Sequence, residues 1–130
     1  MTESIGEDII PRVEYDDFGT ELKESLRSKV ERLGYCGEIW RVGANAPKSM
    51  FCFAEMTEAL KSEIDMKLVE LVALTSAGIM GNTYERNQHE RLSNTLEYGR
   101  DWIKQVNELQ AEPGRHMSDA ECAVQKYVIA

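Results

Sequence analysis

The feature that most constrains this chain is a run of fourteen residues without a charged side chain, from Leu71 to Tyr84. A membrane-spanning helix needs about 20 apolar residues, so this run is too short to cross a bilayer. It is typical of a helix buried in the core of a folded protein. The sequence therefore predicts a domain assembled around a buried helix, with no membrane partner.

Helical spacing also dominates the rest of the chain. Apolar residues recur every three or four positions between glycine, proline and capping residues, and no segment alternates like a strand before a hairpin turn. This pattern predicts an all-α fold of six to seven helices. We expect them over residues 20–33, 35–42, 48–61, 66–80, 83–98, 101–109 and from 119 to the end. The expected N-caps are Thr20, Asp65, Asn82 or Thr83, and Ser118.

Two of these helices carry notable apolar faces. The helix over residues 48–61 is expected to turn four of its side chains inward: Met50, Phe53, Met56 and Leu60. The last helix runs into Ala130 without a cap, on an apolar stripe of Val124, Tyr127, Val128 and Ile129. Helix ends normally need capping, so we expect a chain truncated at its C-terminus. The alternative is that this end packs on a partner.

Length and composition narrow the class further. The 130 residues suit one domain, which we place over residues 17–130 after a flexible N-terminal arm of residues 1–16. A formal net charge of −8 argues against nucleic-acid binding, which needs clustered positive charge. Cys36, Cys52 and Cys122 form neither a CxxC motif nor a zinc-binding pattern, so free thiols are expected. No signal peptide is recognisable, which favours a cytoplasmic protein.

Three side chains stand out as candidates for chemistry. Glu70 interrupts an otherwise apolar helix and is expected to point into a helix–helix contact. Glu85 and His89 lie four residues apart on the inward stripe of the next helix, within reach of each other. A histidine paired with half-buried carboxylates suits proton transfer, because burial raises a carboxyl pKa and a neighbouring anion holds the imidazole tautomer.

Spacing alone leaves other interpretations open. A buried His–Glu hydrogen bond can serve only to order two helices, and ion-pair networks often occupy such positions without doing chemistry. Two glutamates and a histidine can also bind a metal, although this set is incomplete beside the usual helical carboxylate sites. We expect neither a metal nor a cofactor.

The same residues carry a resemblance to a known family. The segments that carry it are Arg41–Pro47, Phe51, Leu68–Val72 and Asn82–His89. Together they resemble the carboxymuconolactone decarboxylase-like, or AhpD-like, superfamily, over roughly residues 11–128. The resemblance implies an all-helical bundle that assembles as a homo-oligomer. It also implies further C-terminal helices, so we expect this chain to be truncated before them.

The resemblance implies an acid–base site between helices. In the peroxidase branch two cysteines act there with a glutamate and a histidine, but the matching positions here are Asn82 and Glu85. Thiol peroxidase activity is therefore not expected. The Tyr-Glu-x-x-x-His form, with Tyr84, Glu85 and His89, is similar to the decarboxylase branch, although Arg86 replaces a frequent tryptophan.

We therefore expect decarboxylation of a small lactone or keto acid, with His89 protonating the enolate. Glu85 is expected to orient His89, and Glu70 to hold the relay or a water. A carboxylate-bearing substrate needs local positive charge. The candidate substrate-binding residues are Tyr84, Asn82, Arg86 and Arg41, with Lys48 as a further cation. The alternatives are a non-catalytic oligomeric scaffold of the same fold and a peroxidase-related redox protein.

Overall fold

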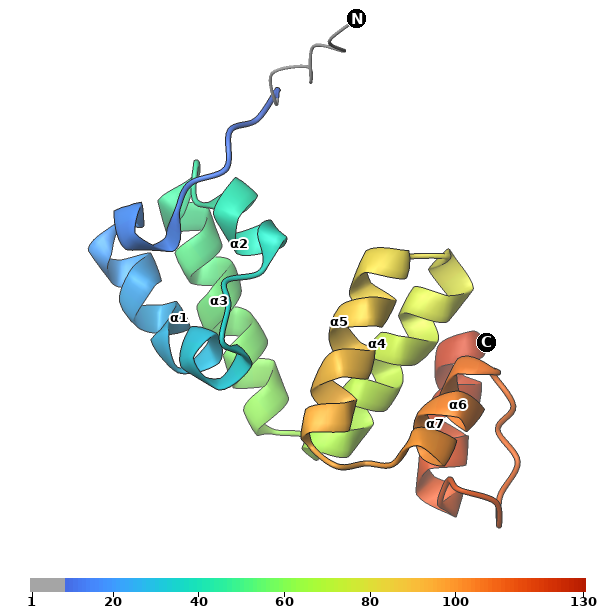
Figure 1. The fold of residues 1–130 in the computed structure, drawn as a ribbon. Helices are drawn as coiled ribbons and strands as arrows, with labels where there is room; N and C mark the ends of the chain where they lie inside the picture. The colour runs from blue at the N-terminus through green and yellow to red at the C-terminus, as the bar shows by residue number, and fades with distance from the viewer. Residues whose placement is uncertain (1–8) are drawn as a thin grey trace, which may run out of the picture. The chain divides into compact units, whose positions relative to one another are not determined.

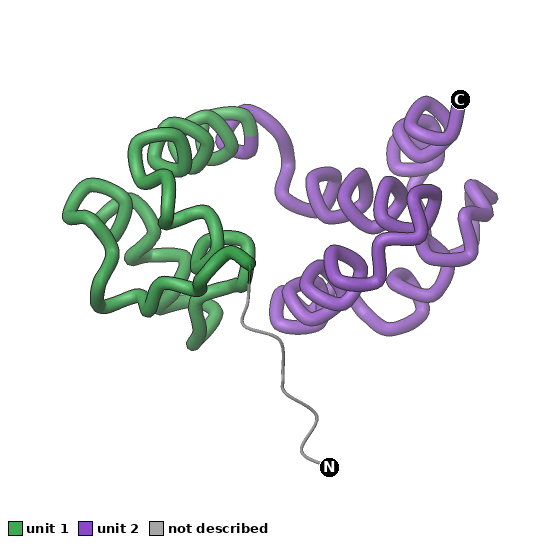
Figure 2. Tube along the Cα trace, turned by 90° about the horizontal axis from the view of Figure 1, so that it is seen from above, with its two compact units in different colours: residues 1–60 green, residues 61–130 purple. Residues whose placement is uncertain are grey.

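A computed structural model describes residues 9–130 of the chain. These residues form seven α-helices and one short 3-10 helix, which confirms the predicted all-α class (Figure 1). The described range contains no β-strand, and a single isolated bridge pairs Pro113 with Met117. No helix in this range combines the length and the hydrophobicity that a membrane crossing requires. The expected domain of residues 17–130 is divided between two compact units, residues 1–60 and 61–130 (Figure 2).

The N-terminal unit holds a 3-10 helix, Tyr15–Asp17, and three α-helices. These are α1 (Thr20–Leu33), α2 (Glu38–Gly43) and α3 (Pro47–Ser62), whose last two residues belong to the other unit. Its core is small. The buried side chains are Phe18, Leu22, Leu26 and Ala54.

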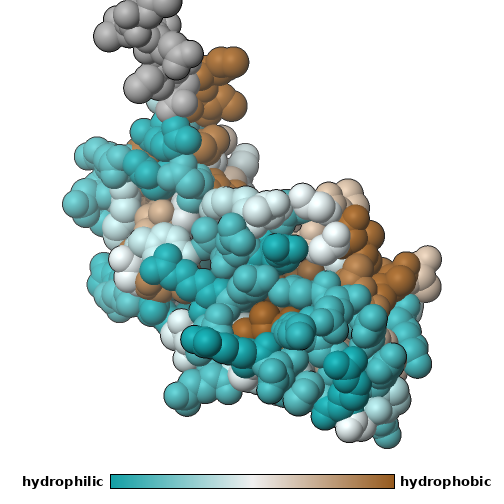
Figure 3. Space-filling model, turned by 45° about the vertical axis from the view of Figure 1, so that its right-hand side comes forward, coloured by the Kyte–Doolittle hydropathy of each residue, from teal (hydrophilic) through white to brown (hydrophobic). Residues whose placement is uncertain are grey.

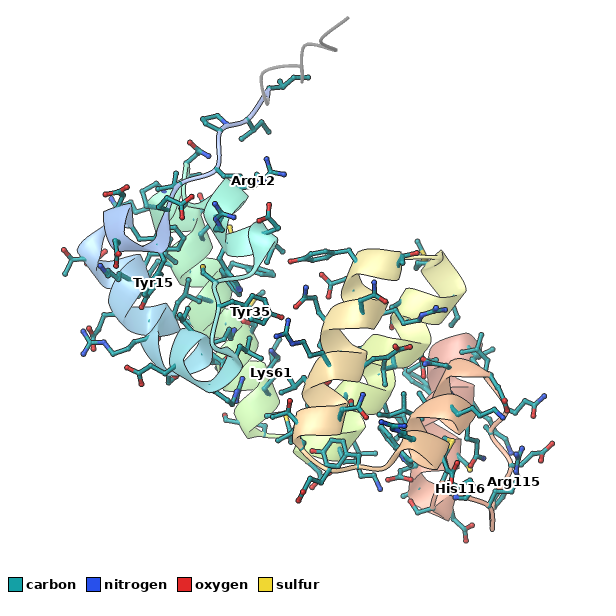
Figure 4. All side chains as sticks on the ribbon, viewed as in Figure 1. Arg12, Tyr15, Tyr35, Lys61, Arg115 and His116 are labelled. Atoms are coloured by element: carbon teal, nitrogen blue, oxygen red, sulfur yellow. The ribbon has the colours of Figure 1, made fainter. Side chains whose placement is uncertain are left out.

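The N-terminal arm expected for residues 1–16 is only partly described, because residues 1–8 lie outside the described residues. Within the described part of the arm, residues 12–15 form hydrogen bonds and an ion pair with the rest of the N-terminal unit. The backbone N–H of Val13 donates to the Arg41 carbonyl at 3.0 Å, and the Tyr15 hydroxyl donates to the Lys23 carbonyl at 3.0 Å (Figure 4). Arg12 also pairs with Glu38. Residues 12–15 are therefore part of the folded unit.

The C-terminal unit is organised around α4 (Met66–Met80). Helices α5 (Thr83–Thr95), α6 (Arg100–Asn107) and α7 (Asp119–Ile129) all contact it, with α5 along one side of α4 and the α6–α7 pair along the other (Figure 1). The core side chains of this unit are Leu71, Leu74, Trp102, Ile103, Val106, Met117 and Cys122. The charge-free run thus begins in the central helix of this unit, where Leu71, Leu74 and Ala77 are buried as predicted, while Ile79 and Met80 further along are exposed.

Local signals fix most of the helix ends. The Asp65 side chain accepts from the Lys67 N–H and caps α4, while Gly81 ends that helix at a left-handed φ of 64°. The predicted capping box at Ser118 is present, because Ser118 and Glu121 each accept from the other's backbone N–H. Thr20 is not a cap, since Gly19 takes that position without a side-chain bond.

Other helix ends differ from the prediction. Helix α2 begins at Glu38 rather than at residue 35, and α6 ends at Asn107. Helix α5 ends at Thr95, three residues early, because Glu97 and Gly99 adopt positive φ angles of 59° and 92°. This turn brings the Tyr98 ring against Trp102, with 5.5 Å between the ring centroids.

The predicted inward face of α3 was partly wrong, and the apolar stripe at the end of α7 lies partly at the surface. On α3, Phe53, Met56 and Leu60 are exposed, while Met50 and its neighbours pack against the core. On α7, Tyr127 is 84% exposed, and the buried face consists of Glu121, Cys122 and Gln125. The reason in α7 is a polar anchor. Gln125 donates to the Thr75 hydroxyl at 3.1 Å and to the Val106 carbonyl at 2.9 Å, which turns the apolar end outward.

Candidate functional site

Glu70 lies within α4, on the side that α5 covers. It is only 1% exposed, and Leu71, Leu74 and Ala77 are buried around it on the same helix. The predicted placement in a helix–helix contact is therefore observed. A buried carboxylate needs a partner, because an isolated charge in the protein interior is strongly unfavourable.

That partner is His89 on α5. Its Nδ1 atom lies 2.8 Å from Glu70 Oε2, and the imidazole is 19% exposed. We assign the proton to Nδ1, because an ionised Glu70 carboxylate only accepts hydrogen bonds. Nε2 is then the ring nitrogen that remains for proton transfer. In Ser-His-Asp enzymes a buried carboxylate likewise orients the histidine and fixes its tautomer.

Glu85 lies one helical turn before His89 and meets the opposite edge of the ring. Its Oε2 is 3.5 Å from Nε2, and the side chain is 39% exposed. This separation exceeds the 2.7–2.9 Å typical of a charge-assisted hydrogen bond, so Glu85 does not form a short hydrogen bond with the ring. The shorter contact to His89 is thus made by Glu70 and the longer one by Glu85, the residue expected from the sequence to orient the ring.

A shallow cavity of about 220 Å³ lies beside Glu85. Its lining comes from one face of α4 and the beginning of α5: Ala73, Ser76, Ala77, Met80, Asn82 and Glu85. Small side chains on α4 leave the space, and Glu85 is the only charged group in the lining. Glu85 therefore connects the cavity to the buried His89–Glu70 pair.

The other predicted site residues are placed as follows. Asn82 lines the cavity and caps α5, accepting from the Glu85 N–H at 3.1 Å. Tyr84 is 37% exposed at the first turn of α5. The guanidinium of Arg86 is 3.4 Å from Glu90, one turn along the helix. Arg41 belongs to the N-terminal unit, where it pairs with Glu14 and Glu38.

Tyr98 was missed by the sequence reasoning. Burial raises its pKa, and the negative charges of Glu70 and Asp65 raise it further. In the sequence Tyr98 is only the residue before Gly99, so no pattern pointed to it.

The arrangement does not favour a metal. No group of three or more His, Cys, Asp or Glu side chains within residues 9–130 is arranged to hold an ion. The reason at this site is that Glu70 and Glu85 contact opposite nitrogens of His89, so the three side chains do not converge on one point. The two carboxylates suit a proton relay through the ring better than a ligand set.

No protein-family model, curated protein or solved structure matches this chain. The resemblance to the decarboxylase-like superfamily therefore remains a prediction from the sequence.

Proposed function

We propose that this protein is an acid–base enzyme of the carboxymuconolactone decarboxylase-like kind, in which His89 transfers a proton to a small lactone or keto acid. The observation that carries the proposal is the 2.8 Å contact between buried Glu70 and His89 Nδ1. This contact leaves Nε2 on the edge of the ring that faces Glu85, and Glu85 also lines a cavity. A buried orienting carboxylate with an available Nε2 is what a general acid or base requires.

The proposed reaction is loss of carbon dioxide. The bond between the carboxylate carbon and the substrate breaks, and its electron pair moves into the substrate to form an enolate or dienolate. The protonated Nε2 of His89 then donates its proton to carbon, and water reprotonates the ring. Glu70 holds the ring in position, and Glu85 assists the exchange of the proton with solvent.

A carboxylate needs a cation, yet the cavity lining holds none. Of the predicted cations, Arg86 is on the same helix as His89 and is half exposed, with Glu90 as its partner. In the proposed reaction Arg86 exchanges this surface pair for the substrate carboxylate. Such an exchange is inexpensive, because exposed ion pairs contribute about 0–1 kcal/mol.

Turnover by matched variants tests the proposal. We expect decarboxylation of a small lactone or β-keto acid, with kcat lowered about 10²–10⁴-fold by His89→Ala, the typical loss for a general acid or base. Glu85→Gln should be milder. The control is His116→Ala, because His116 is the only other histidine and lies on the α6–α7 connection (Figure 4). No turnover by the wild-type protein, or equal turnover by His89→Ala, would contradict the proposal.

A second candidate function is a non-catalytic oligomeric scaffold. It is favoured by the same Glu70–His89 bond, which ties α4 to α5, and by apolar side chains left at the surface. In the C-terminal unit these include Val72, Ile79 and Met80 on α4. Figure 3 shows apolar patches of this kind on an otherwise hydrophilic face. Exposed apolar patches mark association sites, so we also propose a homo-oligomer.

Sedimentation at tens of micromolar tests the oligomer. We expect a defined species larger than the monomer, and Met80→Glu should shift it toward the monomer. A wild-type protein that sediments cleanly as a monomer would contradict the oligomer, and with it the scaffold.

A redox role has the least support. Cys122 is buried and Cys52 is exposed, and no cysteine lies on α4 or α5. We propose that the protein does not sustain peroxide turnover. Dithiol-dependent turnover that disappears in Cys52→Ser would refute this.

A further inference from the structure

Helix α2 is short and poorly buried. It has six residues, none of which is fully buried, and Gly37 at its amino end has no side chain to cap it. Helices shorter than about 12–15 residues are marginal without tertiary support. Trp40 supplies part of that support, because its ring lies 5.9 Å from the Phe53 ring and 4.6 Å from the Lys29 ammonium. Further support comes from residues 11–15, which we call the strap.

The strap bonds to the carboxyl end of α2. The last carbonyls of a helix have no partner within it. Here the Arg41 carbonyl accepts from the Val13 N–H at 3.0 Å. The side-chain amide of Asn45 donates both to the Val42 carbonyl at 2.8 Å and to the Pro11 carbonyl at 2.6 Å. The strap therefore caps α2 from outside the helix.

Two ion pairs also join the strap to α2. Arg12 pairs with Glu38 in the first turn (Figure 4), and Glu14 pairs with Arg41 in the last turn. The side chains of Arg12, Glu38 and Glu14 are 42%, 42% and 69% exposed. Exposed ion pairs are weak, and salt screens them. These pairs therefore hold the strap on α2 loosely, and they weaken as the ionic strength rises.

We propose that the strap and α2 form a latch: they open together as one local unit while the rest of the N-terminal unit stays folded, and the two ion pairs set how often they open. Local opening of this kind is expected where few contacts are buried. Opening uncovers the side chains that pack on the N-terminal core from this region, which include Val13, Cys36 and Trp40. The latch is independent of the proposed decarboxylation, because the His89 site belongs to the C-terminal unit.

Amide hydrogen exchange followed by NMR tests the proposal, because it measures the opening of single hydrogen bonds. The Val13 amide reports the strap. The Ala44 amide, which donates to the Trp40 carbonyl at 2.9 Å, reports the end of α2. We expect these two latch amides to have the same protection factor, lower than that of the Ala54 amide in the buried part of α3. Raising the ionic strength should lower both latch factors together.

Matched substitutions test the ion pairs. Glu38→Gln and Glu14→Gln should each lower the protection of both latch amides by the same factor, about two- to fivefold, the range for an exposed ion pair. The control is Glu24→Gln, which breaks an equally exposed pair with Arg27 within α1 and should leave both latch amides unchanged. The protection of Ala54 should be the same in all three variants, which shows that the unit remains folded.

Different protection factors at Val13 and Ala44 would overturn the proposal, because the strap and α2 would then open separately. Protection of both equal to that of Ala54 would also overturn it, because the latch would then open only when the whole unit unfolds. So would a Glu38→Gln variant whose exchange matches that of the Glu24→Gln control.

Discussion

Replacing His89 by alanine should destabilise the C-terminal unit through the carboxylate that remains. Glu70 is 1% exposed, and its Oε2 loses the partner at 2.8 Å. A hydrogen bond to a charged group contributes about 1.5–3 kcal/mol, and breaking a buried ion pair costs about 3–5 kcal/mol. His89 is itself 19% exposed, so we expect a loss of about 2–4 kcal/mol in the free energy of unfolding.

A second substitution, Glu70→Gln, should change the free energy of unfolding in opposite directions in the wild-type and His89→Ala backgrounds. In the wild-type background, Glu70→Gln should cost about 1 kcal/mol, because it weakens a charge-assisted bond. In the His89→Ala background the same change removes an unpaired buried charge, so it should stabilise the protein. The double variant should therefore be more stable than His89→Ala alone, and a double-mutant cycle gives the coupling.

Urea unfolding followed by tryptophan fluorescence measures these changes. Trp102 lies in the core of the C-terminal unit and Trp40 packs in the N-terminal unit, so a Trp40→Phe background reports the C-terminal unit alone. With an m-value of about 1 kcal/mol/M, His89→Ala should lower the midpoint by about 2–4 M. The reasoning is refuted if Glu70→Gln destabilises both backgrounds equally.

Three other changes follow from the described contacts. Gln125→Ala should cost about 2–4 kcal/mol in urea unfolding, because it orphans buried groups on α4 and α6, whereas exposed Lys126→Ala should change stability by less than about 0.5 kcal/mol. Gly81→Ala should cost about 1 kcal/mol in the same assay, because φ is 64° and nothing lies near an added Cβ. Thiol labelling at pH 8 should be fast at exposed Cys52 and limited by unfolding at Cys122, whose pKa is raised by burial; equal rates would contradict this.

Features set by neighbours in the sequence could be predicted. The caps at Asp65 and Ser118 need only a side chain and a backbone N–H two or three residues away, and both are present. The same holds for Glu85 and His89, because residues four apart on a helix face the same side. The end of α5 was missed because the turn at Glu97 depends on a positive φ that the sequence does not reveal.

Features set by tertiary packing could not be predicted. Spacing placed only Glu85 within reach of His89, and it is the packing of α5 on α4 that brings buried Glu70 to 2.8 Å from the ring. The α4–α5 cavity was likewise not foreseen, since small residues on a helix can be covered or open. The outward turn of Tyr127 follows from Gln125, whose partners lie on two other helices.

The tautomer of His89 tests the central claim most directly. With ¹⁵N-labelled histidine in a His116→Ala variant, His89 is the only labelled ring, and the two nitrogen shifts identify the protonated atom. At a pH where the ring is neutral, the account predicts a proton on Nδ1, donated to Glu70, and an unprotonated Nε2. A proton on Nε2, with Nδ1 free, would contradict it.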